Sequence, residues 1–111
     1  MAGWFELSKS SDDQYRFVLK AGNAEIILTS QMYSKRAAAE GGIRSVQANS
    51  SSDANYERKT ASNDKLFFNL KAANHQVIGS SQMYASEASR ETGINSVKTN
   101  GSSTTVKDMT A

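Results

Sequence analysis

"FVLKAGNAEIILTSQMY", Phe17–Tyr33, recurs 51 residues later as "FNLKAANHQVIGSSQMY", Phe68–Tyr84. The match continues on both sides without a gap, and in the first copy it extends over Phe5–Ser50. Self-similarity at a fixed offset marks a supersecondary unit that is built more than once. We therefore expect one domain, residues 1–111, made of two tandem repeats at residues 1–52 and 53–111.

The hydrophobic period predicts three strands and a helix in each repeat. In the clearest strand, Tyr15, Phe17 and Leu19 alternate with other residues, so they share one face that should point to the core. After "SQMY" the period changes from two to about 3.6. Helices are therefore predicted over Ser34–Asn49 and Ala85–Asn100.

Single residues predict how these elements turn, end and pack. Asn23 and Asn74 lie in tight turns at positions where a left-handed backbone is expected. Asn49 and Asn100 are expected to cap the carboxyl ends of the helices.

A glycine recurs in the middle of both predicted helices, at Gly42 and Gly93. Such a glycine costs about 1 kcal/mol relative to alanine. Its recurrence in both copies indicates that each helix approaches the sheet closely at this point.

The carboxyl-terminal residues repeat a segment that has already begun the second unit. Under the 51-residue offset, Thr104–Met109 falls on Asp53–Arg58. The stretch near Tyr56 would then close the first repeat and open the second, and a last strand over Thr104–Asp108 would close the second. The predicted fold class is α+β, with an antiparallel sheet, two helices on one face and internal pseudo-two-fold symmetry.

The composition excludes several kinds of protein. The 111 residues include no cysteine, so disulfides and thiolate metal sites are excluded. No apolar run reaches the roughly 20 residues that cross a bilayer. The amino-terminal "MAGWFELSKSSDD" lacks the basic and apolar regions of a signal peptide. We expect a cytoplasmic protein that does not bind membranes.

The pattern "LKAxNxxxI…S…Y…A…GIxSVxxN", present in both repeats, resembles the YegP-like family of small bacterial proteins of unknown function. The resemblance covers essentially the whole chain. It implies two three-strand-plus-helix units that share one sheet and exchange their last strands between the halves. It implies no activity, and therefore no catalytic residue.

Few residues could support catalysis or metal binding, and we expect no cofactor and no metal. His75 is the only histidine, and Ala24 takes its place in the first repeat, so it is interpreted as a surface turn residue. Glu6 and Glu57 lie on the first strands of the repeats and could approach each other across the pseudo-two-fold axis. An enzyme that uses this pair is the least favoured hypothesis.

"SQMY" has a structural and a functional interpretation. In the structural one, it is the strand-to-helix joint: Met32 or Tyr33 packs under the helix start, and the serine satisfies free backbone donors there. In the functional one, Gln31, Tyr33, Gln82 and Tyr84 bind a ligand. The structural interpretation is favoured, because a duplicated fold requires duplicated joints.

The favoured function is a non-catalytic binding module with an unknown protein or small-molecule partner. We expect a monomer that acts as an internal pseudo-dimer. The alternative is a weak nucleic-acid binder, whose basic outer sheet face would carry Arg16, Lys20, Phe67 and Lys71. The net charge of only +2, spread along the chain, counts against that alternative.

Overall fold

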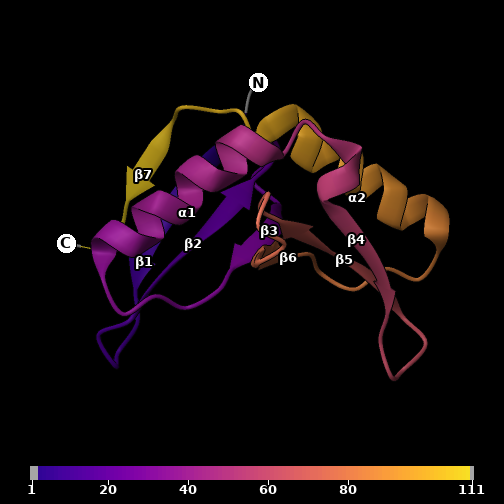
Figure 1. The fold of residues 1–111 in the computed structure, drawn as a ribbon, viewed down its shortest axis with the longest axis horizontal. Coiled ribbons are helices and arrows are strands. Elements are labelled where there is room, and N and C mark those ends of the chain that lie inside the picture. The colour runs from indigo at the N-terminus through magenta and orange to yellow at the C-terminus, as the bar shows by residue number, and fades with distance from the viewer. Residues whose placement is uncertain (1–2, 111) are drawn as a thin grey trace.

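The alternating stretches of both repeats pair into one sheet, with two α-helices on one of its faces (Figure 1). This computed structural model describes residues 3–110. In chain order the elements are β1 (Trp4–Lys9), β2 (Tyr15–Lys20), β3 (Ile26–Ser30), α1 (Arg36–Asn49), the 3₁₀ turn η1 (Asp53–Asn55), β4 (Tyr56–Thr60), β5 (Leu66–Lys71), β6 (Val77–Ser80), α2 (Glu87–Asn100) and β7 (Val106–Asp108).

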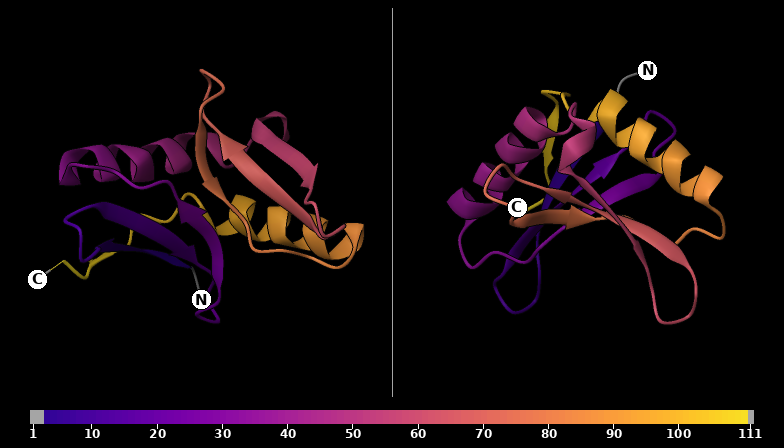
Figure 2. Two further views of the ribbon diagram at one scale, coloured as in Figure 1. Left: turned by 90° about the horizontal axis from the view of Figure 1, so that it is seen from below. Right: turned by 45° about the vertical axis from the view of Figure 1, so that its right-hand side comes forward.

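The strand order is β4-β5-β6-β3-β2-β1-β7, so β4, β5 and β6 of the second repeat form one half of the sheet and β3, β2 and β1 of the first repeat the other. They meet where β3 pairs antiparallel with β6, at Thr29 and Ser80. The 51-residue offset makes these two residues equivalent, so the pseudo-two-fold axis passes between them. Figure 2 shows that the sheet twists strongly, so the strands of the two halves run at an angle to each other.

The last strand crosses from the second repeat to the first. β7 pairs with β1, and it runs parallel to it, so the otherwise antiparallel sheet is mixed. The amide of Phe5 donates to the carbonyl of Thr105 over 3.0 Å, and the amide of Met109 donates to the carbonyl of Leu7 over 2.7 Å. The predicted α+β fold is confirmed, and β7, with three residues, is exchanged as expected. The reciprocal exchange is not present among residues 3–110, because β4 pairs only with β5.

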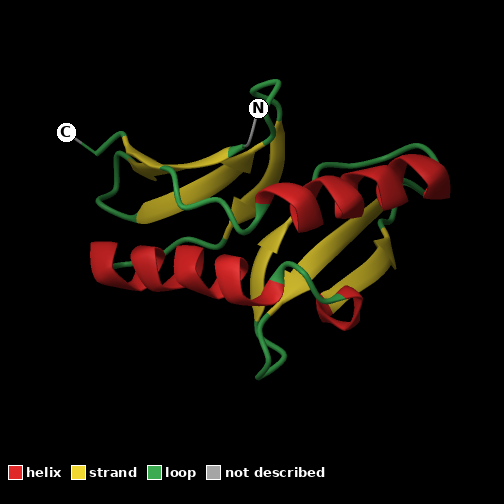
Figure 3. Ribbon diagram, turned by 90° about the horizontal axis from the view of Figure 1, so that it is seen from above, coloured by secondary structure: helices red, strands yellow, loops and turns green. Residues whose placement is uncertain are grey.

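Both helices lie across the same face of the sheet and run over both halves (Figure 3). The side chains between the helices and the sheet are those that the alternation predicted: Phe17 and Leu19 on β2, and Phe68 and Leu70 on β5, are all fully buried. Burial of one such side chain contributes about 1.5–3 kcal/mol. The core is therefore continuous from one repeat to the other.

Each helix approaches the sheet at its central glycine, as the sequence predicted. A Cβ atom added at Gly42 would lie 2.5 Å from the hydroxyl oxygen of Tyr33 and 2.8 Å from Cε2 of Phe17. The same holds for Gly93 and Tyr84 in the second repeat. The tyrosine of "SQMY" therefore packs under the middle of its helix rather than under its start.

The helices begin later than predicted. Lys35 and Ser86 still have an extended backbone, so α1 and α2 start two residues after the predicted positions. The predicted asparagine caps are wrong. Asn49 and Asn100 are the last helical residues, and their side-chain amides donate back to backbone carbonyls one turn earlier.

The tight turns also differ by one residue from the prediction. The left-handed backbone falls on Ala24 and His75, with φ angles of 70° and 68°. The side chains of Asn23 and Asn74 instead accept a hydrogen bond from the amide two residues later. This Asx turn uses the asparagine as an acceptor and leaves the strained conformation to its neighbour.

Candidate functional site: a crevice between the two repeats

The hairpin turn between β2 and β3 in the first repeat faces α2 of the second repeat. The turn is closed by hydrogen bonds of 2.9 Å between Ala21 and Glu25 and between Ala24 and Ala21. On the other side, the ring of Tyr84 stacks on Phe68, with 6.3 Å between the ring centres. The pairing of β3 with β6 in the shared sheet thus brings together two segments that are about sixty residues apart in the sequence.

A crevice of about 460 Å³ lies between these segments. The side of α2 that faces it carries only small residues: Ser89, Thr92, Gly93 and Ser96. The crevice has room because these side chains are short. Its remaining walls are polar and apolar groups of both repeats, namely Ala21, Asn23, Glu25, Ile27, Gln82 and Tyr84.

The charge of the crevice is negative. A neighbouring depression shares Glu25 and Gln82 with it and adds Lys20. Lys20 is already paired with Glu6, with 3.1 Å between the ammonium nitrogen and a carboxylate oxygen. Among residues 3–110, Glu25 has no cationic partner. The arrangement therefore suits a ligand that donates hydrogen bonds, and an amine in particular.

The equivalent positions in the other half are less polar. Under the 51-residue offset, Ala38 is the counterpart of Ser89, Gly41 that of Thr92, and Gln76 that of Glu25. The two halves thus share one backbone but differ in hydrogen-bonding groups. This difference singles out the side formed by the first turn and α2.

The structure separates the four "SQMY" residues into two pairs. Gln82 and Tyr84 line the crevice, whereas Gln31 and Tyr33 do not. Burial raises the pKa of the Tyr33 hydroxyl, which lies against Gly42. A ligand role for the four residues stays a prediction, and the geometry favours it for the second pair.

The serine of "SQMY" serves the neighbouring strand, not the helix start. The hydroxyl of Ser30 accepts a hydrogen bond from the amide of Phe17 over 2.9 Å. Ser81 does the same for Phe68 over 3.0 Å. A backbone bridge then joins each tyrosine to the first residue of the same strand, Tyr15 in the first repeat and Leu66 in the second. The predicted joint is real, but the serine's donor differs from the predicted one.

The residues of the nucleic-acid alternative lie on β2 and β5. Lys71 pairs with Glu57 over 2.9 Å, just as Lys20 pairs with Glu6. Arg16 is exposed, and Phe67 is half-buried. Two of the three predicted cations are thus neutralised by carboxylates, which counts against binding of a phosphate backbone. The alternative stays a prediction.

The predicted approach of Glu6 to Glu57 is wrong. They lie on β1 and β4, and four strands separate these in the sheet, which corresponds to roughly 24 Å at about 4.8 Å per strand. Hydrogen bonds from the Trp4 indole and from Lys20 lower the pKa of Glu6, and hydrogen bonds from Lys71 and Asn69 lower that of Glu57. A catalytic acid would need a raised pKa, so the acid–base hypothesis loses its basis.

Other kinds of site find no support in the described part of the chain. No three histidine, aspartate or glutamate side chains within residues 3–110 gather as metal ligands would. Neither of the two α-helices has the length and apolar character that crossing a membrane requires. His75 lies in an exposed turn, as expected.

Sequence reasoning missed Glu25, Ser89, Thr92 and Ser96 as crevice residues. The first three differ in polarity from their counterparts in the other repeat, and this difference is visible in the sequence. It could not be interpreted there, because nothing in the sequence places the first turn against α2.

Comparison with known proteins gives a consistent match. The family model described as "Domain of unknown function (DUF1508)" matches twice, at residues 10–57 and 61–108. The UPF0339 protein YegP of Escherichia coli strain K12 is 70% identical over 110 residues, which are 99% of this chain and all of that protein. A UPF0339 protein of Acinetobacter baylyi is 68% identical over 99% of both chains.

Two solution NMR structures have the same fold. The structure of the Escherichia coli protein of unknown function yegP superposes with a TM-score of 0.95 at 69% identity, over 100% of this chain and 96% of that one. The structure of a UPF0339 protein from Shewanella oneidensis superposes with a TM-score of 0.93 at 61% identity, over 99% and 93%.

Proposed function

This chain belongs to the family described as Domain of unknown function (DUF1508), and we propose that it is a non-catalytic binding module of the cytoplasm whose ligand site is the crevice between its repeats. It acts as a monomer that is internally a pseudo-dimer. The observation that supports the proposal is the crevice itself, which both repeats line and which has hydrogen-bonding groups that the other half lacks.

The ligand is a small polar molecule with an amine. A volume of about 460 Å³ lies within the range of small-molecule pockets, about 300–1,000 Å³. The carboxylate of Glu25 would pair with the amine, while Gln82 and the hydroxyls of α2 would bind neutral polar groups. Because the walls are partly open, the affinity should be modest, and specificity should come from these polar groups.

Ligand-observed NMR tests the proposal with separate pools of small amines and of neutral polyols. The probe variants are Ser89→Trp, which fills the crevice, and Ala38→Trp, which adds the same ring at the equivalent exposed position of the other half. Compounds from the amine pool should bind the native protein and Ala38→Trp, and should lose binding to Ser89→Trp. A Glu25→Gln variant should bind amines more weakly and leave the binding of neutral polyols unchanged.

Two outcomes would overturn the proposal. One is that no amine binds at millimolar concentration. The other is that binding persists unchanged in Ser89→Trp, which would place the ligand elsewhere on the protein.

A further inference from the structure

The two outer edges of the sheet are covered in different ways. On one side, β7 runs along β1 as a parallel strand. On the other side, β4 is the last strand, and among residues 3–110 no strand lies along its outer edge. Since β4 is the counterpart of β1 under the 51-residue offset, the symmetric place for an eighth strand is vacant. An uncovered strand edge is a template for strand addition, and proteins usually protect such edges.

The 3₁₀ turn η1 protects the first hydrogen-bonding group of this edge. In the first repeat, the amide of Phe5 donates to the carbonyl of Thr105, the residue directly before β7. The equivalent amide, that of Tyr56, donates instead to the carbonyl of Asp53. The turn therefore replaces the first hydrogen bond that a docked strand would make.

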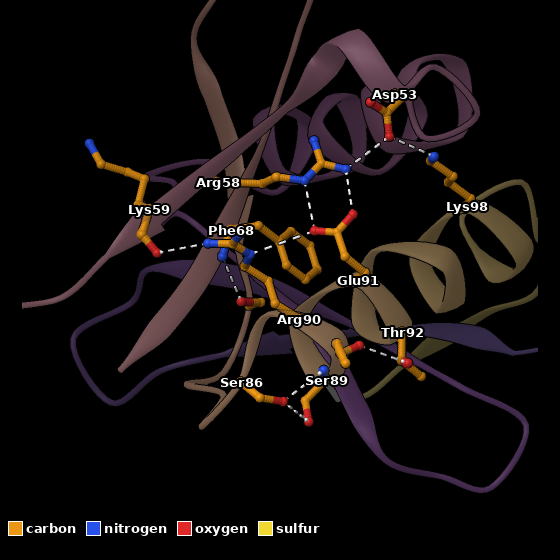
Figure 4. A network of polar contacts seen from close by, with 12 residues as sticks. Asp53, Arg58, Lys59, Phe68, Ser86, Ser89, Arg90, Glu91, Thr92 and Lys98 are labelled. Atoms are coloured by element: carbon orange, nitrogen blue, oxygen red, sulfur yellow. Dashed lines mark hydrogen bonds and ion pairs between the residues drawn. The ribbon is translucent and has the colours of Figure 1, made fainter. Parts of the chain in front are cut away.

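A cluster of charges covers the next position (Figure 4). Arg58 is the counterpart of the buried Leu7. Its guanidinium donates to both carboxylate oxygens of Glu91, over 2.7 and 2.8 Å, and to Asp53 over 3.0 Å. Lys98 donates to Asp53 over 2.8 Å. We call Asp53, Arg58, Glu91 and Lys98 the edge cluster.

The charges of β7 fit this edge. In the first repeat, β7 pairs Val106 with Phe5, and the next two positions follow in register. The same register on β4 would place Lys107 of a second copy opposite Glu57, and Asp108 opposite Arg58. Opposed residues of paired strands point to the same side of a sheet, so both pairs would join opposite charges.

We propose that the outer edge of β4 is a latent acceptor for the carboxyl-terminal strand of a second copy of this chain, and that the edge cluster keeps it closed in the isolated protein. Asp53 and Glu91 both accept from Nη2 of Arg58, the nitrogen that the incoming Asp108 would use. The closure is weak, because 60% of the Asp53 side chain and 44% of the Glu91 side chain are exposed. Ion pairs this exposed contribute only about 0.2–1 kcal/mol each.

The experiment titrates the full-length protein with the peptide SSTTVKDMT, residues 102–110, and follows the backbone amides by NMR. Its probe variant is Asp53→Ala, which removes the competing carboxylate but leaves the backbone carbonyl that accepts from Tyr56. The variant should bind the peptide up to about fivefold more tightly than the native protein, and the shifts should lie in β4 and η1. Glu91→Gln, which weakens the bonds to Nε and Nη2 of Arg58, should act in the same direction.

Two controls separate this proposal from general charge effects. Asp13→Ala removes one carboxylate from a turn in the first repeat and should bind the peptide as the native protein does. A peptide with Lys107→Glu and Asp108→Lys should not bind Asp53→Ala.

The proposal is overturned if folded Asp53→Ala and Glu91→Gln bind no better than Asp13→Ala, or if the native protein binds as tightly as they do. It also fails if both peptides bind equally, or if the shifts fall on β1.

Discussion

The hydroxyl oxygen of Tyr84 lies so close to the backbone of Gly93 that a Cβ atom added there would be 2.2 Å away. The tyrosine ring is fixed from the other side, because it stacks on Phe68 with an interplanar angle of 10°. The helix thus reaches the sheet through a contact that only glycine permits. The same contact links the "SQMY" joint to the wall of the crevice.

Replacing Gly93 by alanine should therefore destabilise the protein. Overpacking costs typically about 1–3 kcal/mol, and the gain in helix propensity is about 1 kcal/mol, so the net loss should lie between about 0 and 2 kcal/mol, towards the upper end for a contact this close. Gly41→Ala is the matched control, since the nearest atom to its added Cβ is 3.8 Å away. That variant should gain about 0.5–1 kcal/mol. Urea unfolding measures both, and an equal response of the two variants would contradict the contact.

The serine of "SQMY" should contribute to stability in both repeats, but unequally. Ser30→Ala would leave the amide of Phe17 without its acceptor in the buried core, at a cost of about 1–3 kcal/mol. Ser81 is less buried than Ser30, so water can replace its hydroxyl more easily. Ser81→Ala should therefore cost less. Equal losses in urea unfolding would show that burial does not decide the effect.

Much of the fold follows from the sequence because the duplication repeats its signals. The alternation of Phe17 and Leu19 correctly predicts the buried face of the strand, and the recurrence of the central glycine correctly predicts the close approach of helix and sheet. The exchanged strand was predicted from the register of Thr104–Met109 together with the family resemblance. A pattern that both copies share, although their sequences differ, reflects the fold rather than chance residues of one copy.

The rest depends on contacts between the repeats that leave no local signal. Glu6 and Glu57 were expected to meet, but the pseudo-two-fold axis runs between β3 and β6 and sends the first strands to opposite sides of the sheet. The crevice arises because the first turn meets α2. Neither segment reveals that partner in its own sequence, so Glu25 and Thr92 could not be assigned to one site.

Removing the hydroxyl of Ser50 should stabilise the protein. Only 1% of this residue is exposed, and its hydroxyl oxygen has no hydrogen-bond partner in the described part of the chain, residues 3–110. A buried polar group without a partner costs about 1–3 kcal/mol, so Ser50→Ala should raise the free energy of unfolding by about 1 kcal/mol. The backbone carbonyl of Ser50, which accepts from the Tyr56 hydroxyl over 2.7 Å, is untouched.

Tyr56→Phe is the companion variant, because it removes the donor to that same buried carbonyl. It should lower the free energy of unfolding by about 1–3 kcal/mol. If Ser50→Ala instead destabilised the protein, the hydroxyl would have a partner in solution, such as a bound water.

Acid should weaken the native state through Asp53 and Asp108. Hydrogen bonds from Lys98 and Arg58 lower the pKa of Asp53 to about 2, and hydrogen bonds from Thr110 and Arg36 lower that of Asp108 to about 2. The ordinary value, which applies to the unfolded chain, is 3.8. A group whose pKa is lowered on folding stabilises the native state above its unfolded value and loses that contribution as the pH falls through its folded value. Both contributions should therefore be nearly complete above about pH 5 and be lost progressively towards about pH 2. Thermal unfolding across this range should show a smaller pH dependence in Asp53→Asn and in Asp108→Asn than in the native protein.

Because Asp108 lies on β7, its variant should also loosen the edge of β1, which amide hydrogen exchange at Phe5 would detect. An unchanged pH dependence in both variants would mean that these carboxylates do not act as described.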